Sequence, residues 1–297
     1  MAIDTAFVNS YRSQFEVQFQ QMESRLRDTV TVLPQNAEFQ YFDRLGTLTA
    51  RAVTARHGNT EFDEIDYTRR RNGILSYDNA VPFDKEDSLR MISDPRMGIA
   101  KNQASAILRQ MDSTIITAAT ATAYGGKAGA TSYAYTAATY GIAVDAVAPG
   151  ATAVNTNLTI EKLIQARSKF YQNEAVEAGE QLYFIASQRN LDSLLRTTEV
   201  TSADYNGVRS LVTGMVDTFL GFKFIRTELL SKSGNIRTCL AYPKSAIILG
   251  LADELKVRID ERFDKRYMWQ VYSCATFGAT RMWEEKVVSV ACDESVA

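Results

Sequence analysis

The chain has little histidine, cysteine and proline. The shortage of histidine and cysteine argues against several kinds of catalytic, metal and disulfide site. Its single histidine, His57, stands beside Gly58 in a sequence typical of a turn. Catalysis through a positioned imidazole therefore has one candidate and no evident partner to orient it. A metal site built from several histidines is excluded by number. Cys239, Cys274 and Cys292 form no C-x-x-C pair, which favours reduced thiols over a disulfide framework or a zinc site.

Long apolar runs and an excess of charge are also missing. No run approaches the ~20 apolar residues that span a bilayer, and the amino terminus lacks the basic-then-apolar layout of a signal peptide. With 33 basic and 35 acidic residues the net charge is -2, so there is no overall attraction to nucleic acid or to an anionic membrane. These features predict a protein made in a cytoplasm.

Catalytic motifs are equally scarce. The segment 124–128 is glycine-rich and contains Lys127, but it follows a predicted helix and lacks the Gly-Lys-Ser/Thr order of a phosphate loop. Acidic clusters at 61–66, 84–87 and 260–264 could supply paired carboxylates for acid–base chemistry, or could simply keep charged loops in solvent. We expect no cofactor and no metal.

The most regular stretch runs from Asp94 to Tyr124. Asp94 and Pro95 suit the N-cap and first position of a helix, and small apolar residues then recur every three or four positions until Gly125 and Gly126. Such a helix would be roughly 45 Å long. The ordinary explanation for it is a single long core helix of an enzyme, to be weighed against what its flanks show.

Two projecting elements precede this helix. Residues 4–27 show the apolar spacing of an amphipathic helix that packs on its own domain or on a neighbour. Residues 36–83 contain short strand-like segments, 48–53 and 65–68, and a hairpin signal at Asn72-Gly73. A polar two-stranded loop buries little of itself, so it needs a surface on its own domain or on another subunit.

Downstream, residues 117–156 predict irregular strands and loops, and 157–245 predict a compact α+β unit. Thr159 and Ser187 can cap helices, 182–186, 219–225 and 236–242 suit strands, and 244–252 suits a short helix. The final residues predict long antiparallel strands, with a turn at Asp264-Lys265, a break at Gly278 and a last apolar run from Val287 to Val290.

This order resembles the major capsid proteins of tailed bacteriophages, which have the Hong Kong 97-like fold. The most specific similarity lies in the segments 264–272 (DKRYMWQVY) and 277–285 (FGATRMWEE), with Asp43-Arg44-Leu45-Gly46 and Asp94-Pro95-Arg96 in support. The resemblance covers nearly the whole chain in order. It implies an α+β fold with an N-terminal arm (1–35), an extended loop (36–83), a peripheral domain with a spine helix (84–156), an axial domain (157–245) and return strands of the peripheral domain (246–297).

The resemblance implies a structural subunit that assembles with itself, as hexamers and pentamers, into an icosahedral virion shell around DNA. Scaffolding, portal and decoration proteins are the other partners it suggests; an arm this short predicts that any scaffold is a separate protein or dispensable. Some relatives join a lysine to an asparagine between subunits. No motif in this sequence matches that chemistry, so we do not predict such a cross-link here. We expect seven charged residues of the loop to fix its register on a neighbour; they are Glu61, Asp63, Glu64, Asp66, Arg69, Arg70 and Arg71. The arginines 69–71 could meet phosphate, but the acids just before them balance their charge, so an inter-strand or inter-subunit ion-pair patch is the better interpretation.

Two alternatives stay open at this point. An encapsulin-type compartment shares the fold but encloses a cargo protein instead of DNA. A carboxylate-dependent enzyme would be a monomer or small oligomer that loses activity when one acidic cluster is mutated.

Overall fold

The computed structural model describes residues 20–52, 56, 59–60, 62–84, 96–148, 150, 152–177, 179–196 and 218–296. Of the described residues, 24% are helical and 39% lie in strands, and the fold is α+β, as predicted. Several predicted features lie outside the described residues; they are the arm helix up to residue 19, His57, Gly58, Glu61, the acidic cluster after Asp84 and the cap Asp94-Pro95.

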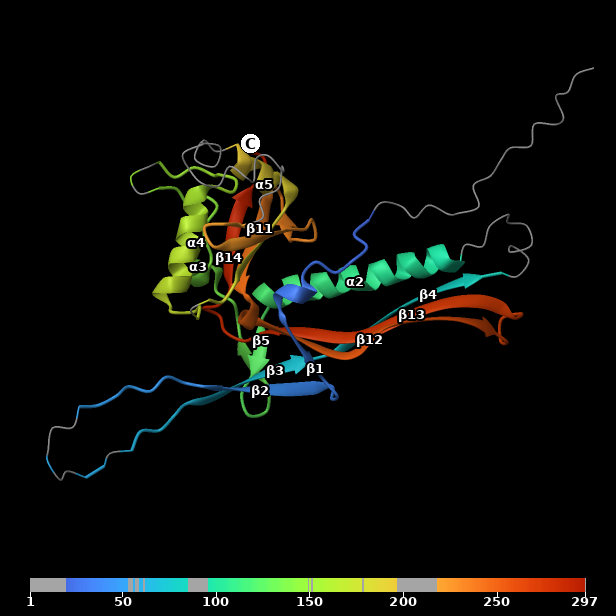
Figure 1. Cartoon of the computed structure of the whole chain (residues 1–297), viewed down its shortest axis with the longest axis horizontal. Coiled ribbons are helices and arrows are strands. Elements are labelled where there is room, and N and C mark those ends of the chain that lie inside the picture. Colours follow the sequence, from blue (N-terminus) through green and yellow to red (C-terminus); the bar gives the residue numbers. More distant parts are fainter. Residues whose placement is uncertain are drawn as a thin grey trace, which may run out of the picture.

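A long helix lies along a long, narrow sheet (Figure 1). Helix α2 spans Arg96–Thr120, and the spacing of its apolar residues predicted it. The sheet has the order β1-β12-β13-β4, with β1 parallel to β12 and the other pairs antiparallel. Its strands are β1 Thr31–Pro34, β4 Leu75–Phe83, β12 Ile247–Arg262 and β13 Met268–Arg281. The predicted β12–β13 hairpin is confirmed.

A second, six-stranded sheet forms the compact unit predicted after residue 157. Its order is β10-β11-β7-β9-β8, and β14 also pairs with β11. The strands are β7 Leu182–Ala186, β8 Thr218–Phe219, β9 Phe222–Arg226, β10 Lys232–Ser233, β11 Ile236–Pro243 and β14 Val288–Asp293. The helices α3 Ala137–Tyr140, α4 Ile160–Gln172 and α5 Gln188–Leu195 accompany it. Thr159 and Ser187 cap α4 and α5 as predicted, each accepting a bond from an amide three residues on.

A third sheet, β2-β3-β5-β6, lies where the loop leaves the body of the molecule (Figure 1). Its strands are β2 Phe39–Leu45, β3 Tyr67–Gly73, β5 Ala123–Gly125 and β6 Thr131–Tyr133. Short 3-10 turns at Arg27–Thr29 and Lys244–Ala246 precede β1 and β12.

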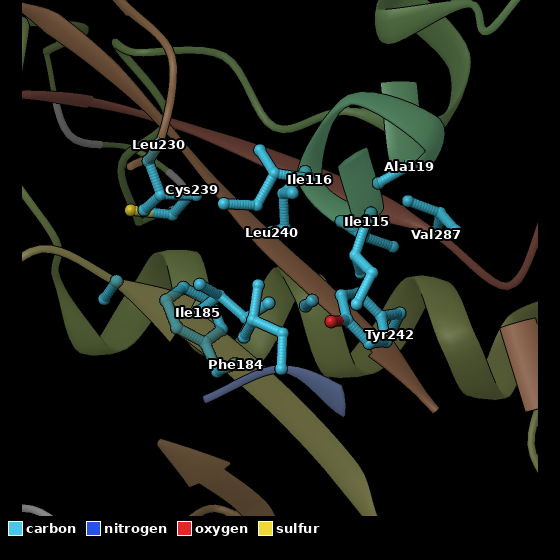
Figure 2. Packing of buried hydrophobic residues seen from close by; sticks show 14 of the residues in the cluster. Ile115, Ile116, Ala119, Phe184, Ile185, Leu230, Cys239, Leu240, Tyr242 and Val287 are labelled. Carbon is cyan, nitrogen blue, oxygen red and sulfur yellow. The ribbon is translucent and has the colours of Figure 1, made fainter. Parts of the chain in front are cut away.

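The main core lies where the end of α2 meets the six-stranded sheet. Figure 2 shows Ile115 and Ile116 of α2 close to Tyr242 and Leu240 of β11, with Phe184 of β7 beside them. Ile115, Tyr242 and Phe184 have no exposed surface. Burial of such side chains contributes about 1.5–3 kcal/mol each, so this contact holds the helix and the compact unit together.

The structure corrects several element boundaries. Helix α2 ends at Thr120, four residues before the predicted end, because the Arg281 guanidinium donates to the carbonyls of Ala119 (2.8 Å) and Ala121 (2.9 Å) and closes its last turn. Residues 20–26 are not helical, and 48–52 form no strand.

Other corrections come from sheet pairing. Residues 247–252, predicted as helix, belong to β12, because a continuous apolar run also suits a strand with neighbours on both sides. Asn72-Gly73 is not a hairpin turn, since β3 and β4 belong to different sheets. Gly278 lies within β13 and does not break it. The run Val287–Val290 leads into β14, which joins the six-stranded sheet.

Candidate functional site

Between β2 and β3, residues 46–52 and 62–66 project from the body of the molecule as the two arms of an extended loop (Figure 1). A hydrogen bond from the Gly46 N–H to the Asp66 carbonyl, 2.8 Å long, closes its neck. Beyond the neck, large apolar side chains stand in solvent: Phe62 is 90% exposed and Leu48 is 55% exposed. The loop therefore presents apolar surface that its own chain does not cover.

The acidic residues predicted to fix the loop lie at its outer part and near its neck. Asp63 forms an ion pair with Arg51, which joins the two arms of the loop. Glu64 and Asp66 are exposed. Glu61 is outside the described residues. The exposed acids thus remain candidates for contact with a second molecule.

The three consecutive arginines have different surroundings. Arg69 forms an inter-strand ion pair with Asp43 of β2 at 2.6 Å, and its hydrogen bond lowers the pKa of the Asp43 carboxyl. The Arg71 guanidinium lies over the rings of Phe39 (4.6 Å) and Tyr124 (5.2 Å). Arg70 is fully buried in its own chain. Arg70 therefore holds the base of the loop and has no surface to offer a neighbour.

Arg70 belongs to a buried arginine cluster at the base of the loop. Its guanidinium pairs with Glu284, donates to the Met282 carbonyl (3.2 Å) and lies 4.0 Å from the centre of the Tyr133 ring. The cluster also contains Arg44 of β2, which donates to the same carbonyl, and Arg281 of β13, 3.5 Å from Glu284. It ties the loop strands β2 and β3 to the end of β13.

Positive charge exceeds negative charge in this cluster. Burial and the nearby charge of Arg70 lower the pKa of Arg44, and burial also lowers that of Arg281, though a guanidinium keeps its proton at neutral pH. Glu284 is the carboxylate in direct contact with both Arg70 and Arg281. A buried cluster of this kind depends strongly on its counter-charge.

A few residues after Arg70, at Gly73, the backbone at the end of β3 crosses close to β13. This crossing fixes the direction of the loop. A Cβ on Gly278 would lie 1.9 Å from the Gly73 carbonyl oxygen, so the chain leaving β3 rests directly on β13. Beside it, the buried amides of Gln35 and Asn72 bond to each other at 2.9 Å, and Asn72 also donates to the Gly278 carbonyl at 3.3 Å. This crossing leaves the base of the loop little freedom.

The tip of the β12–β13 hairpin is a second projecting surface. Phe263 is 81% exposed and Tyr267 is 60% exposed. Arg262 and Asp264 form an ion pair across the turn at 2.6 Å, and the hydrogen bond from Arg262 lowers the pKa of Asp264. The sequence analysis predicted the turn at Asp264-Lys265 but did not single out these aromatic residues.

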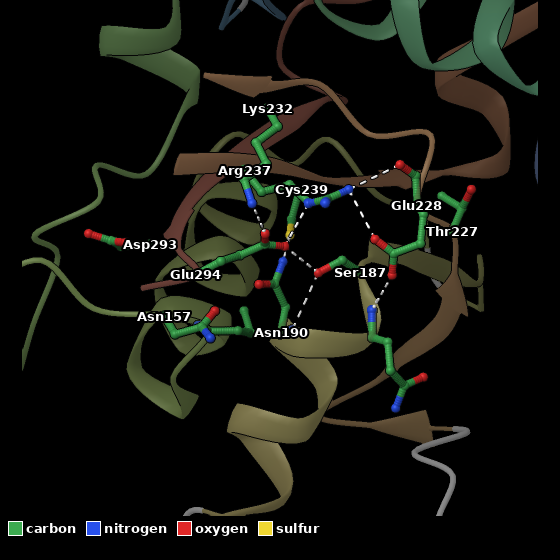
Figure 3. A network of polar contacts seen from close by, with 12 residues as sticks. Asn157, Ser187, Asn190, Thr227, Glu228, Lys232, Arg237, Cys239, Asp293 and Glu294 are labelled. Atoms are coloured by element: carbon green, nitrogen blue, oxygen red, sulfur yellow. Dashed lines mark hydrogen bonds and ion pairs between the residues drawn. The ribbon is translucent and has the colours of Figure 1, made fainter. Parts of the chain in front are cut away.

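The far end of the six-stranded sheet holds a polar network (Figure 3). The nearly buried Glu294 carboxylate pairs with Arg237 (2.6 Å) and Lys232 (2.6 Å) and accepts a hydrogen bond from Ser187 (2.7 Å). Burial alone would raise the pKa of Glu294, but the bonds from Lys232 and Ser187 and the charge of Arg237 outweigh it and lower the pKa. This network fastens the residues after β14 to β10, β11 and α5.

No constellation for catalysis or metal binding appears among the described residues. No group of three or more His, Cys, Asp or Glu side chains there could hold a metal ion. All three cysteines are free thiols, as predicted. None of the described helices is long and apolar enough to cross a membrane. The candidate functional features are instead two projecting surfaces with exposed apolar side chains, the extended loop and the tip of the β12–β13 hairpin.

Comparison with known proteins gives the class of this molecule. A model of the phage capsid protein family matches residues 3–294. Similar solved structures include the capsids of Ralstonia phage GP4 (TM-score 0.75, 10% identity, 97% of this chain and 96% of that chain) and cyanophage P-SCSP1u (0.74, 14%, 98% and 94%). The capsid of Helicobacter pylori bacteriophage KHP30 is also similar (0.71, 10%, 99% and 98%). None of the curated proteins matches.

The chain belongs to the phage capsid protein family. It is a structural protein of the virion, a major capsid protein whose copies assemble with one another into the head shell. The family assignment does not favour the compartment-shell and enzyme alternatives.

Proposed function

We propose that the extended loop lies across a neighbouring copy of the chain and that shell contacts of this kind join hexamers and pentamers. The observation that carries the proposal is a loop with a fixed base and an uncovered apolar outer part. One such contact can be modest, because each subunit makes several and the closed shell makes many.

In this proposal the parts of the chain have separate tasks. Residues 1–35 are the arm, 36–83 the loop, 84–156 the peripheral domain with its spine helix, 157–245 the axial domain, and 246–297 the return strands. The pairing of β14 with β11 supports assigning the last strand to the axial domain instead. Axial domains would meet at the centres of capsomers. The net charge of -2 suits a wall that encloses DNA without sequence-specific binding.

The choice of test variants follows from the burial of the arginines. Reversing Arg69, Arg70 and Arg71 together would place a carboxylate where Arg70 is buried, so this variant would disrupt the fold as well as assembly. Changes at and beyond the neck avoid that problem, because the side chains of Asp66, at the neck, and of Phe62 and Glu64, beyond it, are exposed.

The test compares Phe62→Ser with Phe62→Leu, and a separate variant combines Glu64→Lys with Asp66→Lys. We expect Phe62→Ser and the charge reversal to keep the wild-type Tm yet raise the protein concentration needed for assembly by about 10-fold or more, whereas Phe62→Leu assembles normally. Electron microscopy and size-exclusion chromatography measure this. Normal shells from all three variants at the wild-type concentration would refute loop docking. Nucleic acid inside shells purified from infected cells would distinguish a DNA container from a protein compartment.

A further inference from the structure

A short segment crosses α2 and meets a buried charge there. We name residues 20–30 the strap. Asp112, in the interior of α2, has no exposed surface, although aspartate is a poor helix former and is rarely buried without a partner. Its carboxylate accepts four hydrogen bonds, all from the strap: from Gln21 Nε2 (2.5 Å), Ser24 Oγ (2.5 Å), the Arg25 N–H (3.0 Å) and the Leu26 N–H (3.3 Å).

The strap also touches both sheets. Arg25 donates to the carbonyl of Arg226 at the end of β9 (2.7 Å), and the Thr29 hydroxyl lies 3.0 Å from that of Tyr242 on β11. On the other side Arg27 pairs with Glu254 of β12 at 3.0 Å. Leu26 and Val30 are fully buried in the core between them. One short segment therefore bonds the helix, the six-stranded sheet and the long sheet.

We infer that Asp112 is a positioning residue: it anchors the strap, and the anchored strap sets the orientation of the six-stranded sheet relative to the long sheet. Residues 1–19 continue directly from the strap. Its first residue, Gln20, bonds to Asn102 (2.7 Å) and Arg109 (2.5 Å) of α2, so a force on residues 1–19 reaches these contacts first and the Asp112 contacts next. The consequence for the shell, that a partner holding residues 1–19 would influence subunit curvature, rests on the proposed function. The anchoring itself does not, and it can be measured on unassembled subunits.

The test uses Asp112→Asn, which keeps the size of the side chain but replaces an acceptor oxygen with a donor amide that faces the strap donors. The matched control is Asp253→Asn, an exposed carboxylate paired with Lys256 at 2.5 Å. Trypsin cleaves after Arg25 and Arg27 when the strap opens, and after Lys265 in the exposed hairpin as an internal reference. Spin labels on cysteines placed at Ile164 of α4 and Val257 of β12, in a Cys274→Ser background, report the relative orientation of the sheets.

We expect Asp112→Asn to accelerate strap cleavage by about 100-fold or more, because native-state cleavage follows the population of the open form and about two charge-assisted bonds are lost. Cleavage at Lys265 should not change, and the distance distribution between the labels should broaden. The control should match the wild type. Ser24→Ala removes one donor to the Asp112 carboxylate and leaves its charge in place, so it should accelerate strap cleavage by a smaller factor. It is the test variant if Asp112→Asn does not fold.

Two results would overturn the inference. One is unchanged strap cleavage, or an equal rise at Lys265, which would indicate general destabilisation. The other is rapid strap cleavage with an unchanged label distribution, which would remove the link to sheet orientation. Both readouts come from free subunits, so they stand whether or not loop docking is correct.

Discussion

Replacing Glu284 with glutamine tests the arginine cluster at the base of the loop. Glutamine has the size of glutamate but no charge, so the change removes the carboxylate that contacts Arg70 and Arg281 and leaves three largely buried guanidinium groups close together. Only 17% of the Glu284 side chain is exposed, so solvent replaces little of the lost interaction.

Breaking a buried ion pair by removing one partner costs ~3–5 kcal/mol. For a chain of this size that corresponds to a fall in Tm of about 5–8 °C if unfolding is a single transition. Glu254→Gln is the control, because its pair with Arg27 joins a 73% exposed carboxylate to a 41% exposed guanidinium; we expect a change below about 1 kcal/mol there.

A double variant separates charge from packing. Arg70→Met removes one of the three positive charges and keeps an apolar stem, so its cost should be smaller in the Glu284→Gln background than in the wild type by at least about 1 kcal/mol. Denaturant unfolding of the four proteins gives this coupling energy. A Glu284→Gln protein as stable as the Glu254→Gln control, or strictly additive effects, would refute the view that Glu284 neutralises the cluster.

Two further predictions concern the crossing and the far end of the six-stranded sheet. Gly278→Ala should prevent stable folding or lower the Tm by more than about 5 °C, because the added Cβ would lie 1.9 Å from the Gly73 carbonyl oxygen; a wild-type melting curve would contradict the close crossing. The pKa of Glu294 is depressed below its usual 4.5, so its ionised form stabilises the fold fully above that pH, and the contribution is lost as the pH falls through the folded pKa. The Tm difference between the wild type and Glu294→Gln should therefore shrink between about pH 6 and about pH 3, and a difference independent of pH would show that the ion pairs do not stabilise this end of the sheet.

The sequence predicted elements whose signals are local. The apolar spacing in α2, the caps at Thr159 and Ser187, and the apolar run of β7 each lie within a few consecutive residues, and the structure confirms them. The β12–β13 hairpin was predictable for the same reason. Its alternating side chains and its turn are neighbours in the chain.

The pairing of segments that are distant in the sequence has no local signal, so the sequence did not predict it. Asn72-Gly73 has the composition of a hairpin turn, but Asn72 is buried against Gln35 and the chain crosses from one sheet to another there. The run 247–252 is apolar enough for either a helix or a strand, and only its neighbours β1 and β13 decide between them.

The arginine triplet shows what a sharper use of the sequence could have found. Side chains alternate between the two faces of a strand, so Arg70 and Asn72 share one face of β3 while Arg69 and Arg71 share the other. The structure buries the first pair and leaves the second at least partly exposed. Strand periodicity predicts that split once the strand is extended to Gly73, but it does not predict Glu284 as the partner.

The loop has a fixed base and an uncovered outer part, and we expect variants of these two parts to cause different assembly defects. If the loop docks on a neighbour, immobilising its exposed side chains, such as Phe62 and Leu48, costs free energy, whereas the base is already held by the arginine cluster and by the crossing at Gly278. Variants beyond the neck, such as Phe62→Ser, should therefore weaken each contact, and raising the protein concentration should restore normal shells. Variants of the base, such as Glu284→Gln, should misdirect a loop whose contact residues are intact, so a higher concentration should give malformed particles. A titration of both variants, examined by electron microscopy, distinguishes the two effects, and recovery of normal shells by the base variant would show that the base does not direct the loop.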